Sequence, residues 1–249
     1  MSISHFAPSS IDISTLADIW AIVPASGIGS RMQSEQPKQY LPLQNKRLID
    51  ITLGKLLALK YVKGVVLALA KEDNYWKQGE LYQHPRIHIV DGGKERSDSV
   101  FNALHYTKTH LVCDTPVWAL VHDAARPCVS EDRIHALVSH CLDSQHGGIL
   151  AVPASDTIKR VSNKVKIQHT EDRNTLWLAH TPQLFPLDAL YQALHYCEQN
   201  NIPVTDEASA LEHVGETVSV ITDRPDNIKV TVPEHLAWAE FILSTQKKS

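Results

Sequence analysis

The hydrophobic positions along the chain follow two patterns that alternate with each other. Short, almost continuous apolar runs predict buried strands at Ile19–Val23, Val62–Ala70, Ile87–Val90, Val117–Val121 and Gly148–Val152. Apolar residues spaced three and four apart predict helices at Leu48–Leu59, Ser97–Tyr106 and Ser130–Leu142, and Asp73–Tyr82 is compatible with another. Strands that alternate with helices in this way indicate an α/β fold with a mostly parallel, twisted sheet flanked by helices.

The alternation stops between Ser155 and Gln183. There, Thr157–Val161 and Val165–His169 flank a turn-like Ser-Asn-Lys tripeptide, which predicts a β-hairpin. Its polar and basic composition leaves two interpretations open: a solvated excursion, slightly favoured by composition, or an arm that packs on a partner subunit. Later segments predict helices at Leu187–Asn200, Asp206–His213 and Pro233–Ser244 and a strand at Val218–Ile221. We expect one domain over residues 19–246, preceded by an extension, residues 1–18.

Composition narrows the class of protein without identifying it. The 249 residues carry a net charge of −4 with both signs mixed, so no nucleic-acid-binding or membrane-surface character is expected. Four widely spaced cysteines without a C-x-x-C pair are typical of reduced thiols in a cytoplasmic protein. The extension lacks the basic and apolar regions of a signal peptide, and no apolar run is long enough to span a bilayer.

The first predicted strand runs into small residues that are followed by cations. The small residues are Pro24, Ala25, Ser26, Gly27 and Gly29, and the cations are Arg31 and Lys38. A loop with few side chains lets backbone N–H groups approach a phosphate chain, and the cations would add full positive charges. The glycine spacing alone fits an ordinary strand-to-helix turn equally well. The two cations favour a phosphate-binding site.

Two familiar nucleotide-binding patterns are missing from this loop. It contains no G-x-x-x-x-G-K-[ST] sequence, which excludes a P-loop. A dinucleotide fingerprint would need a third glycine, where this chain has Met32. Asp50 lies about where a ribose-binding acid is expected, so a nicotinamide cofactor remains a minority alternative.

Two further polar clusters directly follow predicted strands. The first, from Asp91 to Ser99, contains Gly92, Gly93 and Arg96, and a glycine turn with a serine cap explains all of it except the arginine. The second, His122–Pro127, contains Asp123, Ala124 and Arg126. Asp123 is suited to hold Mg²⁺ or ribose hydroxyls, or to form an ion pair with Arg126. Because parallel strands end at one edge of a sheet, both clusters should share a cleft with the glycine loop.

Four polar groups lie later in the chain, and each alone reads as a turn or a helix cap. They are Asp172–Asn174, Thr181–Gln183, Thr205–Ala208 and Asp226–Lys229. Together they supply two more cations, Arg173 and Lys229. A phosphorylated second substrate would need such cations.

In their order along the chain, these clusters resemble one enzyme family. The matching motifs are P-A-S-G-I-G-S-R-M from Pro24, P-K-Q-Y from Pro37, D-G-G-K-E-R-S-D-S-V from Asp91, H-D-A-A-R-P from His122, D-T-I-K from Asp156, D-R-N from Asp172, T-P-Q from Thr181, T-D-E-A-S from Thr205 and D-N-I-K-V-T from Asp226. The set resembles the cytidylyltransferases that couple CTP to 2-C-methyl-D-erythritol 4-phosphate in the non-mevalonate isoprenoid pathway. Ser26 departs from the family's usual alanine.

The resemblance implies a Rossmann-like nucleotidyltransferase fold and a homodimer, with an arm of about residues 155–180 embracing the neighbouring subunit. It implies Mg²⁺ as cofactor, held by Asp123, and CTP and a polyol phosphate as ligands. The catalytic cations would be Arg31, Lys38, Arg173 and Lys229. CTP would be bound by Pro24, Ala25, Ser26, Gly27, Gly29, Asp91, Gly92, Gly93, Ser99, Asp123 and Ala124. The sugar phosphate would contact Asp123, Arg126, Thr157, Arg173, Thr181, Thr205 and Lys229.

Three alternatives remain at the level of sequence. A sister cytidylyltransferase that acts on ribitol 5-phosphate would have a similar cradle. An NAD(P)-dependent oxidoreductase is disfavoured by the missing third glycine. A non-catalytic nucleotide-binding protein would carry the same loop but release no pyrophosphate.

Overall fold

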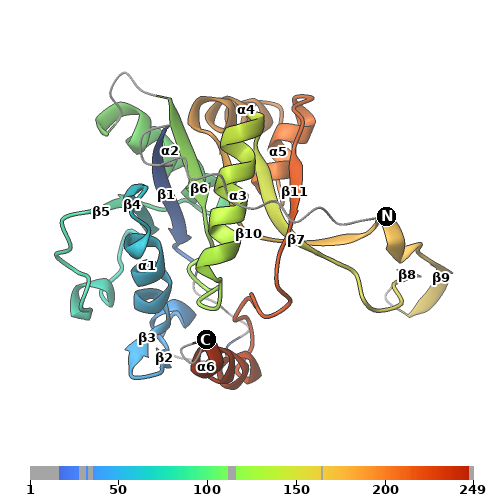
Figure 1. The fold of residues 1–249 in the computed structure, drawn as a ribbon, viewed down its shortest axis with the longest axis horizontal. Helices are drawn as coiled ribbons and strands as arrows, with labels where there is room; N and C mark the ends of the chain where they lie inside the picture. Colours follow the sequence, from blue (N-terminus) through green and yellow to red (C-terminus); the bar gives the residue numbers. More distant parts are fainter. Residues whose placement is uncertain (1–16, 28–31, 33–35, 112–115, 164, 247–249) are drawn as a thin grey trace.

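The structure is a computed structural model that describes residues 17–27, 32, 36–111, 116–163 and 165–246. Within these ranges, seven strands form one twisted sheet (Figure 1). The strands are β1 (Asp18–Ala25), β4 (Val62–Leu69), β5 (Ile87–Asp91), β6 (Val117–Val121), β7 (Gly148–Pro153), β10 (Trp177–Pro186) and β11 (Ser219–Thr222). Their order across the sheet is β11-β7-β10-β6-β1-β4-β5. Six of the seven were predicted from the apolar runs.

Parallel pairing brings several strand ends to one edge of the sheet. β1 pairs in parallel with β4 on one side and with β6 on the other, and β4 pairs in parallel with β5. Ala25 at the end of β1 lies opposite Leu69, and Leu69 lies opposite Asp91. The polar segments after β1, β5 and β6 therefore leave the sheet on the same side, as the alternating pattern predicted.

Helices cover both faces of this sheet. The α-helices of the described ranges are α1 (Leu48–Ala58), α2 (Arg96–His110), α3 (Glu131–Ser144), α4 (Leu187–Gln199), α5 (Glu207–His213) and α6 (Glu234–Gln246). Of these, α6 packs beside β2 and the start of α1 instead of on the sheet (Figure 1). One face of β1, including Ile19 and Val23, packs with α1 and α3, whereas Ile22 on the opposite face packs with α2 and α4. Both faces of the central strands are buried, which explains why their sequences are continuously apolar instead of alternating.

β10 was not predicted as a strand. The Thr181–Gln183 group, interpreted above as a turn or cap, lies inside β10 and is fully buried. β10 is antiparallel to both β6 and β7, and its register with β7 shifts between Ala179 and Gln183. Pro182 lies in this irregularity, where its lack of an N–H costs no ladder hydrogen bond. The sheet is thus mostly parallel with one antiparallel strand near its centre.

The helix suggested at Asp73–Tyr82 is wrong. Only a short 3-10 helix, Trp76–Gln78, forms there, and the flanking residues make turns. The Asp73 carboxylate accepts hydrogen bonds from the backbone N–H groups of Tyr75 and Trp76 at 3.0 and 2.8 Å. This local side-chain bonding competes with the helical pattern, as aspartate commonly does.

The predicted hairpin is present as β8 (Lys159–Ser162) and β9 (Lys166–Thr170), and it projects from the body of the molecule (Figure 1). The arm is shorter than residues 155–180, because Trp177–Ala179 already pair with β7. Two smaller strands, β2 (Pro42–Leu43) and β3 (Lys46–Arg47), form a separate hairpin near α6. No helix in the described ranges combines the length and apolar character needed to cross a bilayer.

Candidate active site

A cleft of about 190 Å³ lies at the carboxyl edge of the sheet. Residues after β1 and β6 and from the start of α2 contribute to its lining, together with one 3-10 helix and one late loop. The lining residues are Pro24, Ala25, Ser26, Gly27, Lys38, Gln39, Lys94, Glu95, Arg96, Asp123, Ala124, Ala125 and Lys229. Cations and backbone groups from segments 200 residues apart in the sequence therefore face one small space.

Asp123 is the central acid of this cleft. Its Oδ1 accepts a hydrogen bond from Arg96 Nε at 2.9 Å, and Lys229 Nζ lies 2.7 Å from its Oδ2. Arg126 Nε is 3.8 Å from the same Oδ2. Burial alone would raise the pKa of Asp123, but Arg96, Lys229 and Arg126 outweigh burial and hold that pKa well below its usual range. Asp123 is therefore a carboxylate throughout the physiological pH range.

Arg96 is held in place by a second acid. The buried Glu207, at the start of α5, binds Arg96 through both carboxylate oxygens, at 2.6 Å from Nη1 and 3.0 Å from Nη2. Burial would lower the pKa of Arg96, but Glu207 and Asp123 raise it above its usual value. This fork-to-fork geometry fixes the direction in which Nε meets Asp123. Glu207 was missed in the sequence, since no local pattern links two residues 111 positions apart.

The glycine loop and the second cluster touch directly. Ser26 Oγ lies 2.8 Å from Ser99 Oγ, and Ser99 Oγ accepts a hydrogen bond from the backbone N–H of Gly93 at 3.0 Å. A Cβ placed on Gly92 would lie 2.4 Å from Ser26 Cβ, so only glycine allows this approach. Ser26, the departure from the family's usual residue, thus connects the two loops.

Lys38 reaches the cleft from a short 3-10 helix, Lys38–Tyr40. The neighbouring Gln39 is buried, and its Nε2 donates to the carbonyl oxygen of Ala25 at 2.7 Å, which ties this helix to the end of β1. Lys38 Nζ donates to the carbonyl oxygen of Val230 at 3.3 Å. The lysine therefore lies beside both the glycine loop and the segment that carries Lys229.

A buried network of hydrogen bonds holds the backbone at Asp123 in place. Thr181 Oγ1 accepts a hydrogen bond from the Asp123 backbone N–H at 3.0 Å and lies 3.1 Å from His122 Nδ1. His122 Nε2 lies 3.1 Å from the carbonyl oxygen of Arg126, which can only accept, so Nε2 carries the proton and Nδ1 accepts from Thr181. Burial lowers the pKa of His122 to about 4, so the ring is neutral at pH 7. Arg126 itself donates to the carbonyl oxygen of Asn227 at 2.6 Å.

Other predicted residues lie outside the cleft lining. Thr157 and Arg173 are exposed at the arm, where Arg173 donates to the carbonyl oxygen of Ser155, and Thr205 is exposed before α5. Gly92 and Ser99 contact Ser26, Gly93 binds Ser99, and Asp91 is exposed at the end of β5. Arg126 and Thr181 are buried beside Asp123. The remaining predicted residues, Gly29 and Arg31, fall outside the described residues.

Asp50, the acid that would bind ribose if the chain used a nicotinamide cofactor, does not lie at the cleft. Asp50 is buried in α1, and its two carboxylate oxygens accept hydrogen bonds from Arg47 at 2.6 and 2.8 Å. It does not line the cleft. The interpretation of Asp50 as a ribose-binding residue is therefore wrong, because Arg47 occupies both of its oxygens.

The cleft offers few ligands for a metal ion. Among the described residues, no group of three or more His, Cys, Asp and Glu side chains could hold a cation. Asp123 is one carboxylate, which suits Mg²⁺ when phosphate oxygens and water supply the other ligands. Both of its oxygens contact cationic side chains, so a metal ion would take the place of Lys229 or Arg96 at one of them.

Comparison with known proteins identifies close similarities over nearly the whole chain. The family model for 2-C-methyl-D-erythritol 4-phosphate cytidylyltransferase matches residues 19–245. The protein of that name from Actinobacillus pleuropneumoniae is 49% identical over 226 residues, covering 91% of this chain and 96% of its own length. The one from Mannheimia succiniciproducens is 47% identical with the same coverage. The crystal structure of the Francisella tularensis protein has a TM-score of 0.79 at 37% identity, covering 91% of this chain and all of its own.

Proposed function

This chain belongs to the 2-C-methyl-D-erythritol 4-phosphate cytidylyltransferase family, and we propose that the cleft around Asp123 is its active site. The chain is a nucleotidyltransferase that transfers a cytidylyl group to 2-C-methyl-D-erythritol 4-phosphate in isoprenoid biosynthesis. The observation that carries the assignment of the site is the meeting of Lys38, Lys229 and Asp123 around one cavity at the carboxyl edge of the sheet.

The reaction needs charge stabilisation more than proton transfer. A phosphate oxygen of the sugar phosphate attacks the α-phosphorus of CTP and forms the new O–P bond. The bond from that phosphorus to the bridging oxygen breaks, and pyrophosphate leaves with the electron pair. The attacking phosphate is already ionised at neutral pH, so no general base is required. Lys38, together with Arg31, would neutralise the negative charge that accumulates around the α-phosphorus.

CTP is expected to lie along the glycine loop. The backbone from Ala25 to Gly29 would approach the triphosphate, with no described atom within 4 Å of a Cβ on Gly27 to obstruct it. We expect the cytosine base of CTP to be recognised beside the paired Ser26 and Ser99 hydroxyls and the Gly93 backbone. Asp123 remains ionised and would accept from ribose hydroxyls or bind a metal ion.

We expect Mg²⁺ to bind between Asp123 and the triphosphate. The ion would supply positive charge to phosphate oxygens that the protein cations do not reach. In the structure, Lys229 contacts Asp123 at 2.7 Å. Replacement of that contact by the ion would leave the Lys229 ammonium available to the sugar phosphate, which is the role assigned to it above.

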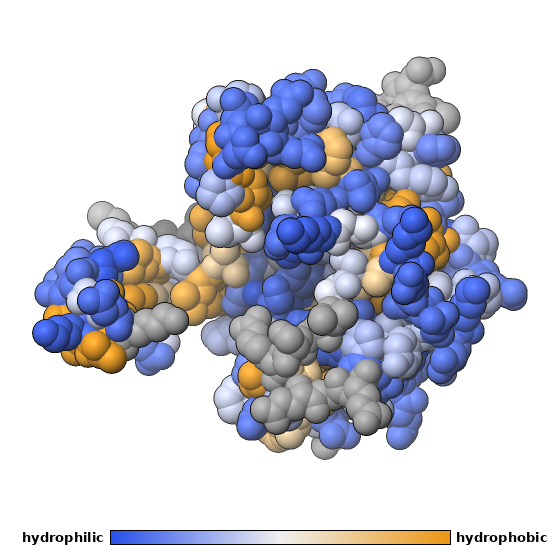
Figure 2. Space-filling model, turned by 180° about the vertical axis from the view of Figure 1, so that it is seen from behind, coloured by the Kyte–Doolittle hydropathy of each residue, from blue (hydrophilic) through white to orange (hydrophobic). Residues whose placement is uncertain are grey.

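We also propose that two copies of the chain form a dimer through the arm. Apolar side chains are exposed on this arm (Figure 2), and Val161, Val165 and Ile167 are each more than half accessible to solvent. Large exposed apolar groups of this kind mark contact surfaces. Thr157 and Arg173 lie at the same arm and outside the cleft of their own chain, so we expect them to complete the cleft of a partner subunit.

The cytoplasm is the compartment we propose for this enzyme. Three cysteines in the described ranges, Cys128, Cys141 and Cys197, are buried free thiols. Burial raises the pKa of Cys128 and Cys141 to about 12, which keeps both protonated and unreactive. This thiol chemistry suits a reducing environment.

The test is pyrophosphate release with each of four nucleoside triphosphates, Mg²⁺ and two acceptors. We expect release with CTP and 2-C-methyl-D-erythritol 4-phosphate to exceed release with ribitol 5-phosphate or with another nucleotide. Faster turnover of ribitol 5-phosphate would favour the sister activity. Absence of release with every pair would contradict the proposed site and reaction.

A further inference from the structure

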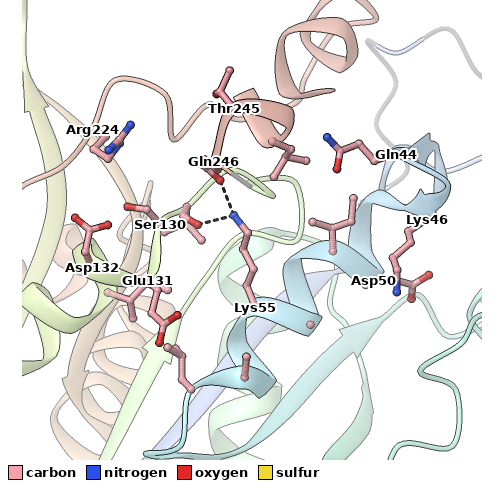
Figure 3. Close-up of a pocket in the computed structure, with 17 residues that line it drawn as sticks. Gln44, Lys46, Asp50, Lys55, Ser130, Glu131, Asp132, Arg224, Thr245 and Gln246 are labelled. Atoms are coloured by element: carbon pink, nitrogen blue, oxygen red, sulfur yellow. Dashed lines mark hydrogen bonds between the residues drawn. The ribbon is translucent and has the colours of Figure 1, made fainter. Parts of the chain in front are cut away.

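A second, larger cavity lies between α1, the start of α3 and the end of α6 (Figure 3). Its volume is about 780 Å³, within the range typical of sites for small organic molecules. None of the residues that line it also lines the cleft around Asp123. The catalytic reaction therefore leaves this cavity unexplained.

Lys55 projects from α1 into the cavity (Figure 3). Its Nζ donates to the carbonyl oxygen of Val129 at 2.8 Å and to Oε1 of Gln246 at 3.0 Å. Both partners are neutral, and an ammonium group has three N–H donors. Burial lowers the pKa of Lys55, because its charge is partly removed from water. An anionic partner would stabilise this ammonium.

The other charged residues of the lining already have partners of opposite or potentially opposite charge. These pairs are Lys46–Glu80, Asp50–Arg47, Glu131–His135, Asp132–Arg133 and Arg224–Asp226. Within the described residues, Lys55 has no carboxylate within 4 Å, and Figure 3 shows the side chains of Glu131 and Asp132 directed away from its nitrogen. Asp226 attracts the Lys55 charge only from beyond this distance, so the cavity contains one partly buried ammonium that no carboxylate of the described residues contacts.

The remaining walls are apolar and leave space. Ile51, Val129, Ile134 and Leu243 line the cavity, and Gly54 opens the face of α1 between them. No described atom lies within 4 Å of a Cβ placed on Gly54. Glycine in a helix costs about 0.5–1 kcal/mol relative to alanine, yet here no close packing requires it. The open wall accommodates an apolar group next to the Lys55 ammonium.

We propose that this cavity is a binding site for a small amphipathic carboxylate, with the carboxylate at Lys55 and the apolar part against Gly54. The site has a physical connection to the catalytic segment. Gln246 bonds Lys55 through Oε1 and donates from Nε2 to the carbonyl oxygen of Cys128 at 2.8 Å. Cys128 follows the segment that carries Asp123, so a ligand that displaces Gln246 from Lys55 would loosen this connection.

The test uses isothermal titration of the full chain with octanoate, and with octanol as the neutral probe. Two variants attack the site in different ways: Lys55→Met removes the charge, and Gly54→Leu fills the space. Two matched controls leave it intact: Lys60→Met removes an exposed lysine just after α1, and Gly54→Ala adds only one methyl group.

We expect saturable octanoate binding to the unmodified chain, at least about tenfold weaker binding of octanol, and a similar loss for octanoate in Lys55→Met and Gly54→Leu. The controls should bind octanoate as the unmodified chain does. Gly54→Leu should also retain normal cytidylyl transfer, which would show that this variant folds. If Lys55→Met does not fold, the binding measured with Gly54→Leu still tests the proposal. The proposal is overturned if octanoate does not saturate, if octanol binds equally well, or if Gly54→Leu binds octanoate normally.

Discussion

Replacing Glu207 by glutamine tests whether the Arg96 anchor is as strong as its geometry indicates. The substitution keeps the shape of the side chain but removes the negative charge that binds Arg96 through two hydrogen bonds. Glu207 is almost completely buried, so water cannot replace the lost interaction on that side. Breaking a buried ion pair costs about 3–5 kcal/mol when an isolated charge is left behind.

The expected loss here is smaller, for two reasons. Arg96 keeps its contact with Asp123, and 28% of its side chain remains exposed to solvent. We therefore predict that Glu207→Gln lowers the free energy of unfolding by about 2–3 kcal/mol. The kcat/KM for CTP should fall roughly tenfold as well, since Arg96 would orient Asp123 less firmly.

The assay is guanidinium denaturation followed by circular dichroism, with the slope m compared between variants. Glu212→Gln is the matched control, because Glu212 lies on the same helix and is exposed. The control should change the free energy of unfolding by less than about 0.5 kcal/mol. If Glu207→Gln were as mild as the control at equal m, the buried pair would not have the stabilising role assigned to it.

Three further predictions follow from named groups. Lys38→Ala should lose about two orders of magnitude in turnover at saturating substrate while remaining folded, and near-normal turnover would refute its catalytic role. The pKa of His122 is lowered from 6.5 to about 4, so its neutral form stabilises the fold fully above pH 6.5 and loses that effect as the pH falls toward 4. The loss should total about 3 kcal/mol in denaturation measured across that range and should shrink in His122→Asn. Gly54→Ala should raise the free energy of unfolding by about 0.5–1 kcal/mol, and destabilisation would show that the wall of α1 is not open.

The parallel part of the sheet could be predicted because its strands are buried on both faces. Runs such as Val62–Leu69 are short, contain few polar residues and are rich in valine, and these features together indicate a buried strand. β10 did not show this signal. His180, Thr181 and Gln183 are polar yet buried, because each binds residues from other segments: His180 binds Asp223, Thr181 binds His122 and Asp123, and Gln183 binds Asp206. A buried strand whose polar side chains take part in a hydrogen-bond network has the sequence pattern of a loop.

The candidate site was predictable to the extent that topology determines it. The ends of parallel strands must share an edge, so the segments after β1, β5 and β6 could be placed together. The residues that bind the charged side chains could not be predicted from the sequence. Glu207 meets Arg96, and Gln246 meets Lys55, only after chain segments far apart in sequence have packed. Thr157 and Arg173 are exposed outside the cleft of their own chain, and the contacts that we propose for them with a partner subunit are likewise not encoded by the pattern of a single chain.

The most direct test of the active-site assignment measures pyrophosphate release from CTP and 2-C-methyl-D-erythritol 4-phosphate by Lys229→Met. Lys63→Met is the control, since Lys63 lies on the same sheet but pairs with Asp18, at the opposite end of β1 from the cleft. We predict that Lys229→Met loses about 100-fold in kcat/KM and keeps its fold, whereas Lys63→Met retains normal activity. Equal activity of the two variants would contradict the assignment of the Asp123 cleft as the site of cytidylyl transfer.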